Sequence, residues 1–339
     1  MNIPKISIIV PSYNQGEYLE ATLTSVISQQ YPNLELFVAD GGSRDNSVEI
    51  IKKYESHITW WVSEKDNGQS DAINKGLQRV TGDIVSWLCS DDLFTPGTLH
   101  KVAALFSQQS NDVGLIHGGS TLFKTSGKVA DSWGYDNPSL ERNIAGMAFP
   151  QPSAFFLKKY LDVVGRQVNT ELHYGMDYDL FCRLACVCRF TPVKDIFSQY
   201  RLHDSSKSVK EQDRFIDDWS AVFINLCKNA GWNEITNELN GSEFLPEKVL
   251  AFYYQFSFTP DKTILQSADK RKILFYHYCY LLKAFYWSGQ MEPAKKLLKQ
   301  LKSGYPAAWL KTEKDIPGIM KKLALPEIVL KTLKKIKRL

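Results

Sequence analysis

Apolar and polar positions alternate in blocks along the first hundred residues. Four short runs rich in β-branched and aromatic residues predict strands. These runs are residues 6–10, 34–38, 59–62 and 84–89. Between the first two runs, apolar residues recur at helical spacing, as at Leu19, Leu23 and Val26. Repetition of strand and helix predicts an α/β fold, with a mostly parallel sheet flanked by helices on both faces.

Local signals refine this expectation. The run at 84–89 is almost entirely apolar, which predicts a central strand buried on both faces. Ser70 follows an Asn-Gly turn and is expected to cap a helix. Pro96 is suited to the first turn of another helix.

The pattern changes beyond residue 110. Residues 113–117 and 190–196 predict strands, residues 179–186 predict a helix, and from about Asp213 only helical patterns remain. We therefore expect a domain of residues 1–215 and an all-α region of residues 216–339. In that region, residues 273–288 and 291–301 resemble one helical hairpin of tetratricopeptide type.

The cysteines bear on a possible metal site and on the cellular compartment. Cys182, Cys186 and Cys188 form the only cluster among the six, and no fourth ligand follows at a spacing suited to zinc. Packing in the core is the better interpretation. The cysteines show no disulfide framework, which indicates a reducing compartment.

Charge is concentrated in the last residues of the chain. The whole chain carries a net charge of +4, but residues 321–339 contain seven basic residues and one glutamate, so the remainder is slightly acidic. Nucleic-acid binding by the main domain is therefore not expected. After Pro326, leucines and isoleucine interleave with lysines, a pattern suited to an anionic membrane surface. The alternative is a terminal helix that packs on its own domain.

The N-terminal residues do not form a signal peptide, and no apolar stretch reaches the roughly 18 residues of a membrane span. We therefore expect a cytoplasmic protein. If the basic tail binds lipid, the protein would act at the inner face of the cytoplasmic membrane.

Polar clusters follow three of the predicted strands. They are Pro11-Ser12-Tyr13-Asn14, Asp40-Gly41-Gly42 and Ser90-Asp91-Asp92. In open α/β sheets, ligands bind beyond the carboxyl ends of the strands, so these clusters are candidates for one site.

Asp91 and Asp92 form the most informative of these clusters. Two carboxylates about 4 Å apart repel by roughly 1 kcal/mol in water and roughly 4 kcal/mol at an effective dielectric constant near 20. At the end of a buried strand they require a cation or strong hydrogen bonds, and oxygen ligands favour Mg²⁺ or Mn²⁺. The alternative is that these residues cap the next helix.

Together, these segments resemble glycosyltransferase family 2, which has the GT-A fold. The resemblance rests on residues 6–14, 40–47 and 90–92, in this order and at this spacing. Residues 64–68 and 71–76 are similar to the subgroup found in bacterial surface-polysaccharide synthesis. The resemblance extends over roughly residues 5–210.

The resemblance implies a nucleotide-sugar donor site. Pro11, Tyr13 and Asp40 would line the pocket for the base. Asp71 would lie near the ribose or the diphosphate, and Asp91 near the ribose or the sugar. For Asp40, a simple turn role before two glycines is the alternative interpretation.

The resemblance also implies a metal site for Mn²⁺ or Mg²⁺. Asp92 would bind the ion, and His203, in the segment Tyr200–Ser208, would complete its shell. The alternative for His203 is an ordinary histidine in a solvent-exposed loop.

A third implied role is the general base that takes the proton of the acceptor hydroxyl. Asp177 would be this base; Met176 stands where the family usually has a glutamate. Two alternatives are Asp179 as the base and a purely helix-initiating role for both aspartates.

The expected function is therefore metal-dependent, inverting transfer of a sugar, with UDP-sugars favoured, to a saccharide or lipid-linked saccharide acceptor. The alternative is a non-catalytic nucleotide-sugar-binding or scaffold protein whose helices bind partners. The sequence lacks the G-x-G-x-x-G motif of a dinucleotide-dependent dehydrogenase and a kinase-type P-loop. It also lacks the Gly-rich, Arg-containing loop expected of a nucleotide-sugar pyrophosphorylase.

Overall fold

The computed structural model describes residues 3–132, 139–203 and 212–325. The strands in these ranges form one sheet in the order β3-β2-β1-β4-β8-β6-β9-β5, with β7 paired to β6. Their bounds are β1 (Ile6–Ser12), β2 (Leu34–Asp40), β3 (Trp60–Ser63), β4 (Ile84–Trp87), β5 (Leu93–Phe94), β6 (Val113–Lys124), β7 (Gly127–Ser132), β8 (Ala154–Leu157) and β9 (Arg189–Arg201).

The sheet is parallel in its first half and mixed in its second. Strands β1 to β4 pair in parallel, as the strand–helix repeat predicts. Strand β8 then runs antiparallel to both β4 and β6, whereas β6 and β9 are parallel. The expected α/β fold is confirmed, but the sheet as a whole is mixed. A helix between two strands lets them pair in parallel, and the regular alternation of strand and helix ends after β4.

Strand β1 shows how the sequence builds both faces of the sheet. Ile6, Ile8 and Val10 belong to the core on one side, and Ile9 belongs to the core on the other. All four are fully buried, as alternation along a strand between two helical layers requires. A Cβ on Gly76 of the helix opposite would lie 2.5 Å from Ile9 Cγ2, so only glycine allows this close packing.

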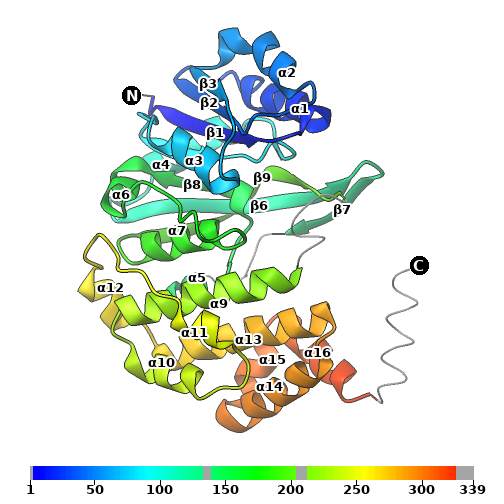
Figure 1. The fold of residues 1–339 in the computed structure, drawn as a ribbon. Coiled ribbons are helices and arrows are strands. Elements are labelled where there is room, and N and C mark those ends of the chain that lie inside the picture. The colour runs from blue at the N-terminus through cyan, green and yellow to red at the C-terminus, as the bar shows by residue number, and fades with distance from the viewer. Residues whose placement is uncertain (1–2, 133–138, 204–211, 326–339) are drawn as a thin grey trace.

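Helices cover both faces of the sheet (Figure 1). Those of the first 185 residues are α1 (Gly16–Ile27), α2 (Ser47–Lys53), α3 (Gln69–Leu77), α4 (Thr98–Ser107), α5 (Leu140–Ala145), α6 (Lys158–Val163) and α7 (Met176–Ala185). Strand β4 lies between β1 and β8 with all four residues buried, so the predicted central strand is confirmed.

One local prediction and one alternative interpretation are wrong. Helix α3 begins after Gly68, whose φ of 108° suits glycine, and Ser70 lies inside the helix with its Oγ 2.8 Å from Met176 Sδ. Neither Asp91 nor Asp92 caps α4, because β5 intervenes and the N-cap of α4 is Gly97.

From residue 212 onward, every described element is a helix. They are α9 (Gln212–Asn229), α10 (Asn233–Asn240), α11 (Glu247–Ala251), α12 (Lys262–Ser267), α13 (Lys270–Ser288), α14 (Met291–Gly304), α15 (Ala307–Thr312) and α16 (Ile316–Leu323). The predicted helical hairpin corresponds to α13 and α14. Among the described residues, no helix combines the length and the apolarity that crossing a bilayer requires. The basic segment after Pro326 lies outside the described residues.

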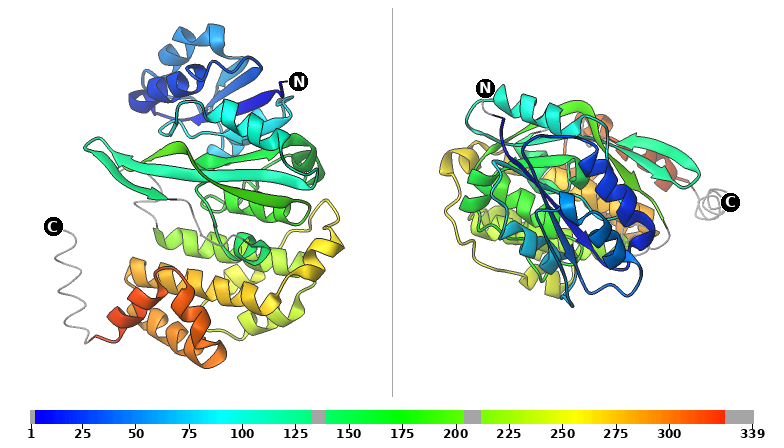
Figure 2. Two further views of the ribbon diagram at one scale, coloured as in Figure 1. Left: turned by 180° about the vertical axis from the view of Figure 1, so that it is seen from behind. Right: turned by 90° about the horizontal axis from the view of Figure 1, so that it is seen from above.

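The helical region packs directly against the sheet domain. Figures 1 and 2 show α9 beneath α7, with α13 to α16 beyond it. One hydrophobic cluster runs without interruption from Ile9 and Trp87 through Phe181 to Phe223 and Leu323. The expected boundary at residue 215 falls within α9, so the described structure has no exposed linker at that position.

The clustered cysteines lie in this shared core. Cys182, Cys186 and Cys188 are buried, and burial raises the pKa of Cys186 to about 12. Their role in packing is confirmed.

Candidate functional site

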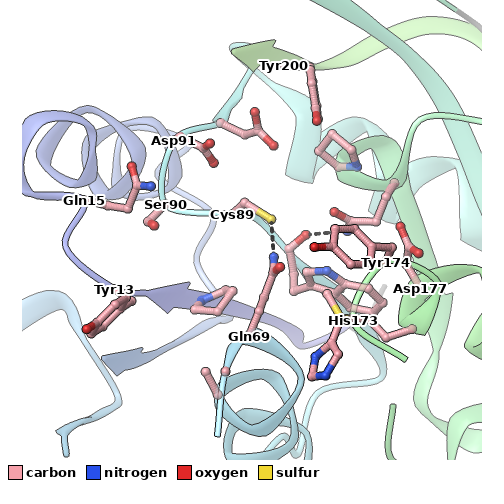
Figure 3. A pocket seen from close by; sticks show the side chains of 18 of the residues that line it. Tyr13, Gln15, Gln69, Cys89, Ser90, Asp91, His173, Tyr174, Asp177 and Tyr200 are labelled. Atoms are coloured by element: carbon pink, nitrogen blue, oxygen red, sulfur yellow. Dashed lines mark hydrogen bonds between the residues drawn. The ribbon is translucent and has the colours of Figure 1, made fainter. Parts of the chain in front are cut away.

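A pocket of about 890 Å³ opens at the carboxyl ends of β1 and β4. Its first wall comes from the loops after these strands and from the start of α3; its second comes from the segment before α7 and from α9. In Figure 3, Tyr13 and Asp177 lie on opposite sides of the pocket, and Cys89 and Asp91 lie between them.

The loop after β1 is held in place by the loop after β2. The Asn14 side-chain oxygen accepts a 2.8 Å hydrogen bond from the Arg44 backbone N–H, and the Asn14 backbone N–H donates to Ser43 Oγ at 2.7 Å. Asp45 accepts from the Gly16 N–H at 2.8 Å. With this loop fixed, Tyr13 is 58 % exposed at the pocket edge, where it is available to a ligand.

Asp92 is buried at the end of β4. Its Oδ1 accepts a hydrogen bond of 2.9 Å from the Arg201 backbone N–H on β9. The hydroxyl of Thr22, on α1, lies 2.9 Å from the Ser90 carbonyl oxygen and 2.8 Å from the Asp92 carbonyl oxygen. These contacts hold the turn that carries the acid pair against α1. The two neighbouring aspartates are thus fixed by contacts to two separate elements.

His203 lies beside this acid pair. Its Nε2 is 2.9 Å from Asp91 Oδ2, and its ring packs on Tyr18 with centroids 4.9 Å apart. Arg201 donates from Nε to the Asp91 carbonyl oxygen at 2.9 Å. The histidine expected to complete the metal shell therefore contacts Asp91, which the sequence assigned to the donor, and lies close to Asp92, which it assigned to the metal.

The electrostatics of the acid pair favour a cation. Burial raises the pKa of Asp92 well above its usual range, and the charge of Asp91 adds to this effect. Within the described residues, ligand atoms of Cys89, Asp91 and Asp92 lie within 4.8 Å of one another. A donor set dominated by carboxylate oxygen fits Mn²⁺ or Mg²⁺, and a divalent ion would offset the repulsion between the buried Asp92 and the partly exposed Asp91.

Two predicted donor residues do not line the pocket. Asp40 is buried and accepts hydrogen bonds from the Gly42 and Ser43 backbone N–H groups and from the Ser63 hydroxyl, at 3.1, 2.9 and 2.6 Å. It therefore shapes the turn after β2, the alternative raised from the sequence. Asp71 Oδ2 accepts from the Asn67 N–H at 3.1 Å and also lies outside the pocket wall.

The pocket wall contains residues that sequence reasoning missed. Asp66, rather than Asp71, lines it, as do Gln69 and Cys89, joined by a hydrogen bond from Gln69 Nε2 to the Cys89 sulfur at 3.2 Å. The signals near Asp66 were the Asn-Gly turn before α3 and the similarity of residues 64–68 to the polysaccharide subgroup, and neither assigned Asp66 a role. The aromatic residues of the second wall gave no such signal.

The opposite wall carries the candidate base. Asp177 lies in the first turn of α7 and lines the pocket, half-buried. Asp179 is 1 % exposed; it pairs with Arg183 at 2.9 Å and accepts a hydrogen bond from the Tyr254 hydroxyl. Asp179 is therefore part of a buried ion pair that anchors α7, and only Asp177 of the two faces the cavity.

The Asp179–Arg183 pair yields a stability prediction. Replacement of Arg183 with methionine leaves a buried carboxylate without its counter-charge, so we expect the free energy of unfolding to fall by about 3–5 kcal/mol in urea titrations. The matched control is Arg189→Met, which breaks the exposed pair with Asp112 and should leave the free energy of unfolding close to the wild-type value. Equal losses in the two variants would contradict the anchoring role.

Comparison with known proteins agrees with this geometry. Residues 7–143 match the family described as glycosyl transferase family 2. An uncharacterised glycosyltransferase of Nostoc is 29 % identical over 246 residues, which cover 69 % of this chain and 74 % of that protein.

Two solved structures share the fold. The S. aureus TarS 1–349 structure in complex with UDP-GlcNAc superposes with a TM-score of 0.57 at 16 % identity, covering 89 % of this chain and 93 % of TarS 1–349. A mannosyltransferase from Pyrobaculum calidifontis, in complex with GDP-Man and Mn²⁺, gives a TM-score of 0.50 at 17 % identity, covering 95 % of this chain and 87 % of that one. The fold is thus the GT-A fold of these transferases.

Proposed function

Because the chain belongs to glycosyltransferase family 2, we propose that it transfers a sugar from a nucleotide-sugar donor to an acceptor hydroxyl, with inversion at the anomeric carbon. The observation that carries this proposal is the placement of acids on two walls of one pocket. Asp91 and Asp92 lie at the strand ends, and Asp177 lies across the cavity on α7.

The first wall is suited to the donor. Pro11 and the exposed ring of Tyr13 line the part of the pocket where a base can stack. Asp91 and Asp92, with His203 beside them, would hold a divalent ion, and that ion would offset the charge of the diphosphate as it leaves. A UDP-sugar is the first donor to test, since TarS binds UDP-GlcNAc in its crystal structure.

The second wall is suited to activation of the acceptor. Asp177 takes the proton of the acceptor hydroxyl while the hydroxyl oxygen forms a bond to the anomeric carbon. The bond from that carbon to the diphosphate breaks, and its electron pair leaves with the phosphate oxygen. A single in-line displacement of this kind inverts the anomeric centre.

We further propose a place for this reaction in the synthesis of bacterial surface polysaccharide, with a saccharide or lipid-linked saccharide as the acceptor. The sequence similarity of residues 64–68 and 71–76 to that subgroup supports this assignment. The proposed location is the cytoplasm, at the inner face of the membrane.

The proposal is tested with UDP-GlcNAc, UDP-glucose, UDP-galactose and GDP-mannose, each with Mn²⁺ and with EDTA. We expect one donor to release its nucleoside diphosphate only with the metal. NMR of the transfer product would then show the anomeric configuration opposite to that of the donor. If wild type and Asp177→Asn both bind UDP and are equally inert with every donor, the alternative of a nucleotide-sugar-binding scaffold is favoured.

A further inference from the structure

The end of the pocket beyond Asp177 is aromatic, unlike the acidic end at β4. Its surface comes from Tyr174, just before α7, and from Phe215 and Trp219 on the first helix of the C-terminal region. Met147 and Phe149, in the segment after α5, complete this part of the wall. We call Tyr174, Phe215 and Trp219 the aromatic wall.

The rings of the aromatic wall are held in place by contacts within the protein. Phe215 meets Tyr174 edge-on with centroids 5.1 Å apart, and Trp219 stacks on Tyr280 of α13 at 4.9 Å and 24°. The Trp219 indole N–H donates to the Tyr174 carbonyl oxygen at 3.0 Å. These contacts fix the rings before any ligand arrives, so little conformational freedom is lost on binding.

The same helix fixes the backbone that leads to Asp177. Asp218 Oδ2 accepts a 2.7 Å hydrogen bond from the Tyr174 N–H, while the neighbouring Trp219 binds the carbonyl of the same residue. A Cβ on Gly175 would lie 3.1 Å from the Asp218 Cβ, so α9 packs tightly on this segment. The aromatic wall and the base are therefore held by one set of contacts.

We propose that the aromatic wall is the acceptor subsite and that it binds a sugar ring of the acceptor by stacking. This inference rests on the proposed transferase function. The face of an aromatic ring is weakly negative and attracts the weakly positive C–H bonds on one face of a pyranose. The ring hydroxyls then point sideways, where Asp177 can reach one of them.

The size and chemistry of the pocket support this occupant. About 890 Å³ lies near the upper end of the range of about 300–1,000 Å³ for small-molecule sites, so the pocket can hold a donor and part of a second substrate. The wall is made of rings with polar groups at their edges, such as the Tyr174 hydroxyl, which accepts from Arg214 at 3.0 Å. An acyl chain would be better served by aliphatic side chains.

The test uses the full-length chain with its active donor, Mn²⁺ and a panel of methyl glycosides as acceptors. Phe215→Leu keeps an apolar side chain and removes the ring; Trp219→Leu is a second variant, and Trp287→Leu, which changes an exposed ring outside the pocket, is the matched control. We expect the acceptor KM to rise about tenfold in Phe215→Leu and Trp219→Leu. In Phe215→Leu, donor hydrolysis in the absence of acceptor and the KM of the donor should stay at wild-type values. Trp219→Leu also loses the hydrogen bond to the Tyr174 carbonyl, so only its acceptor KM is compared with wild type. The control should be unchanged throughout.

Three results would overturn this proposal while leaving the transferase function intact. The first is an acceptor KM equal to wild type in both wall variants. The second is an acceptor KM that is lower for octyl than for methyl glycosides in the wild type and equal for both in Phe215→Leu. The wall would then bind an alkyl chain. The third is hydrolysis of the donor with no methyl glycoside contacting the protein in saturation-transfer NMR. Failure of every donor with the wild-type chain would instead count against the proposed function itself.

Discussion

Replacement of Asp177 with asparagine is expected to lower kcat for sugar transfer by about 10²–10⁴-fold. The amide keeps the shape of the side chain but cannot accept a proton from the acceptor hydroxyl. Because Asp177 lies across the pocket from Asp91 and Asp92, binding of UDP with Mn²⁺ should remain at the wild-type level. The measurement is steady-state transfer together with calorimetry of nucleotide binding.

Glu171→Gln provides the control for this change. Glu171 is an exposed carboxylate six residues before Asp177 and does not line the pocket, so its replacement should leave kcat unchanged. A transfer rate for Asp177→Asn within a few fold of wild type would contradict its role as the base. Loss of nucleotide binding together with activity would indicate a structural role instead.

Replacement of Asp92 with asparagine is expected to abolish metal-dependent transfer and to stabilise the metal-free protein at neutral pH. The amide oxygen can still accept the hydrogen bond from the Arg201 N–H, so the turn is retained. The folded-state pKa of Asp92 is raised by burial and by Asp91. The wild-type protein therefore loses stability as pH rises from the unfolded-state pKa toward the folded-state one, and the variant does not.

Thermal unfolding with and without Mn²⁺ tests both parts of this second prediction. In the wild type, Mn²⁺ at 100 times its Kd should add about 2.7 kcal/mol of stability. In Asp92→Asn the melting temperature should start higher without metal at pH 7.5 and rise little when Mn²⁺ is added. Asp162→Asn, an exposed change on α6, should behave like wild type. A wild-type Mn²⁺ response in Asp92→Asn would contradict the metal site.

Much of the N-terminal half of the fold followed from periodicity. Strands β1 to β4 are short, apolar and separated by helical patterns, and their pairing is as expected. The acid pair at the end of β4 could also be placed, because parallel strands bring their carboxyl ends to the same edge. The second half of the sheet could not be derived, since the order of β8, β6 and β9 depends on long-range packing rather than on a local repeat.

The candidate site, too, could be predicted only in part. Asp91, Asp92, Asp177 and His203 lie at one pocket as the sequence resemblance implied. Asp40 looked like a ligand contact, but its carboxylate is engaged by its own turn, and only coordinates could reveal those hydrogen bonds. The aromatic wall was missed because helix packing brings Tyr174 and Trp219 together from distant parts of the sequence. In addition, aromatic residues at helical spacing usually indicate side chains that pack in the core.

The uninterrupted hydrophobic cluster has a consequence for how the chain folds as it is made. Phe181 of α7 stacks on Trp87 of β4, and the cluster that contains both rings continues through helices that end at Leu323. Translation at about 5–20 residues per second would leave the outer side of α7 without its covering helices for on the order of ten seconds after residue 215 is synthesised. During that interval the nascent chain presents apolar surface, and a chaperone that shields it until α13 to α16 emerge should raise the yield of native protein.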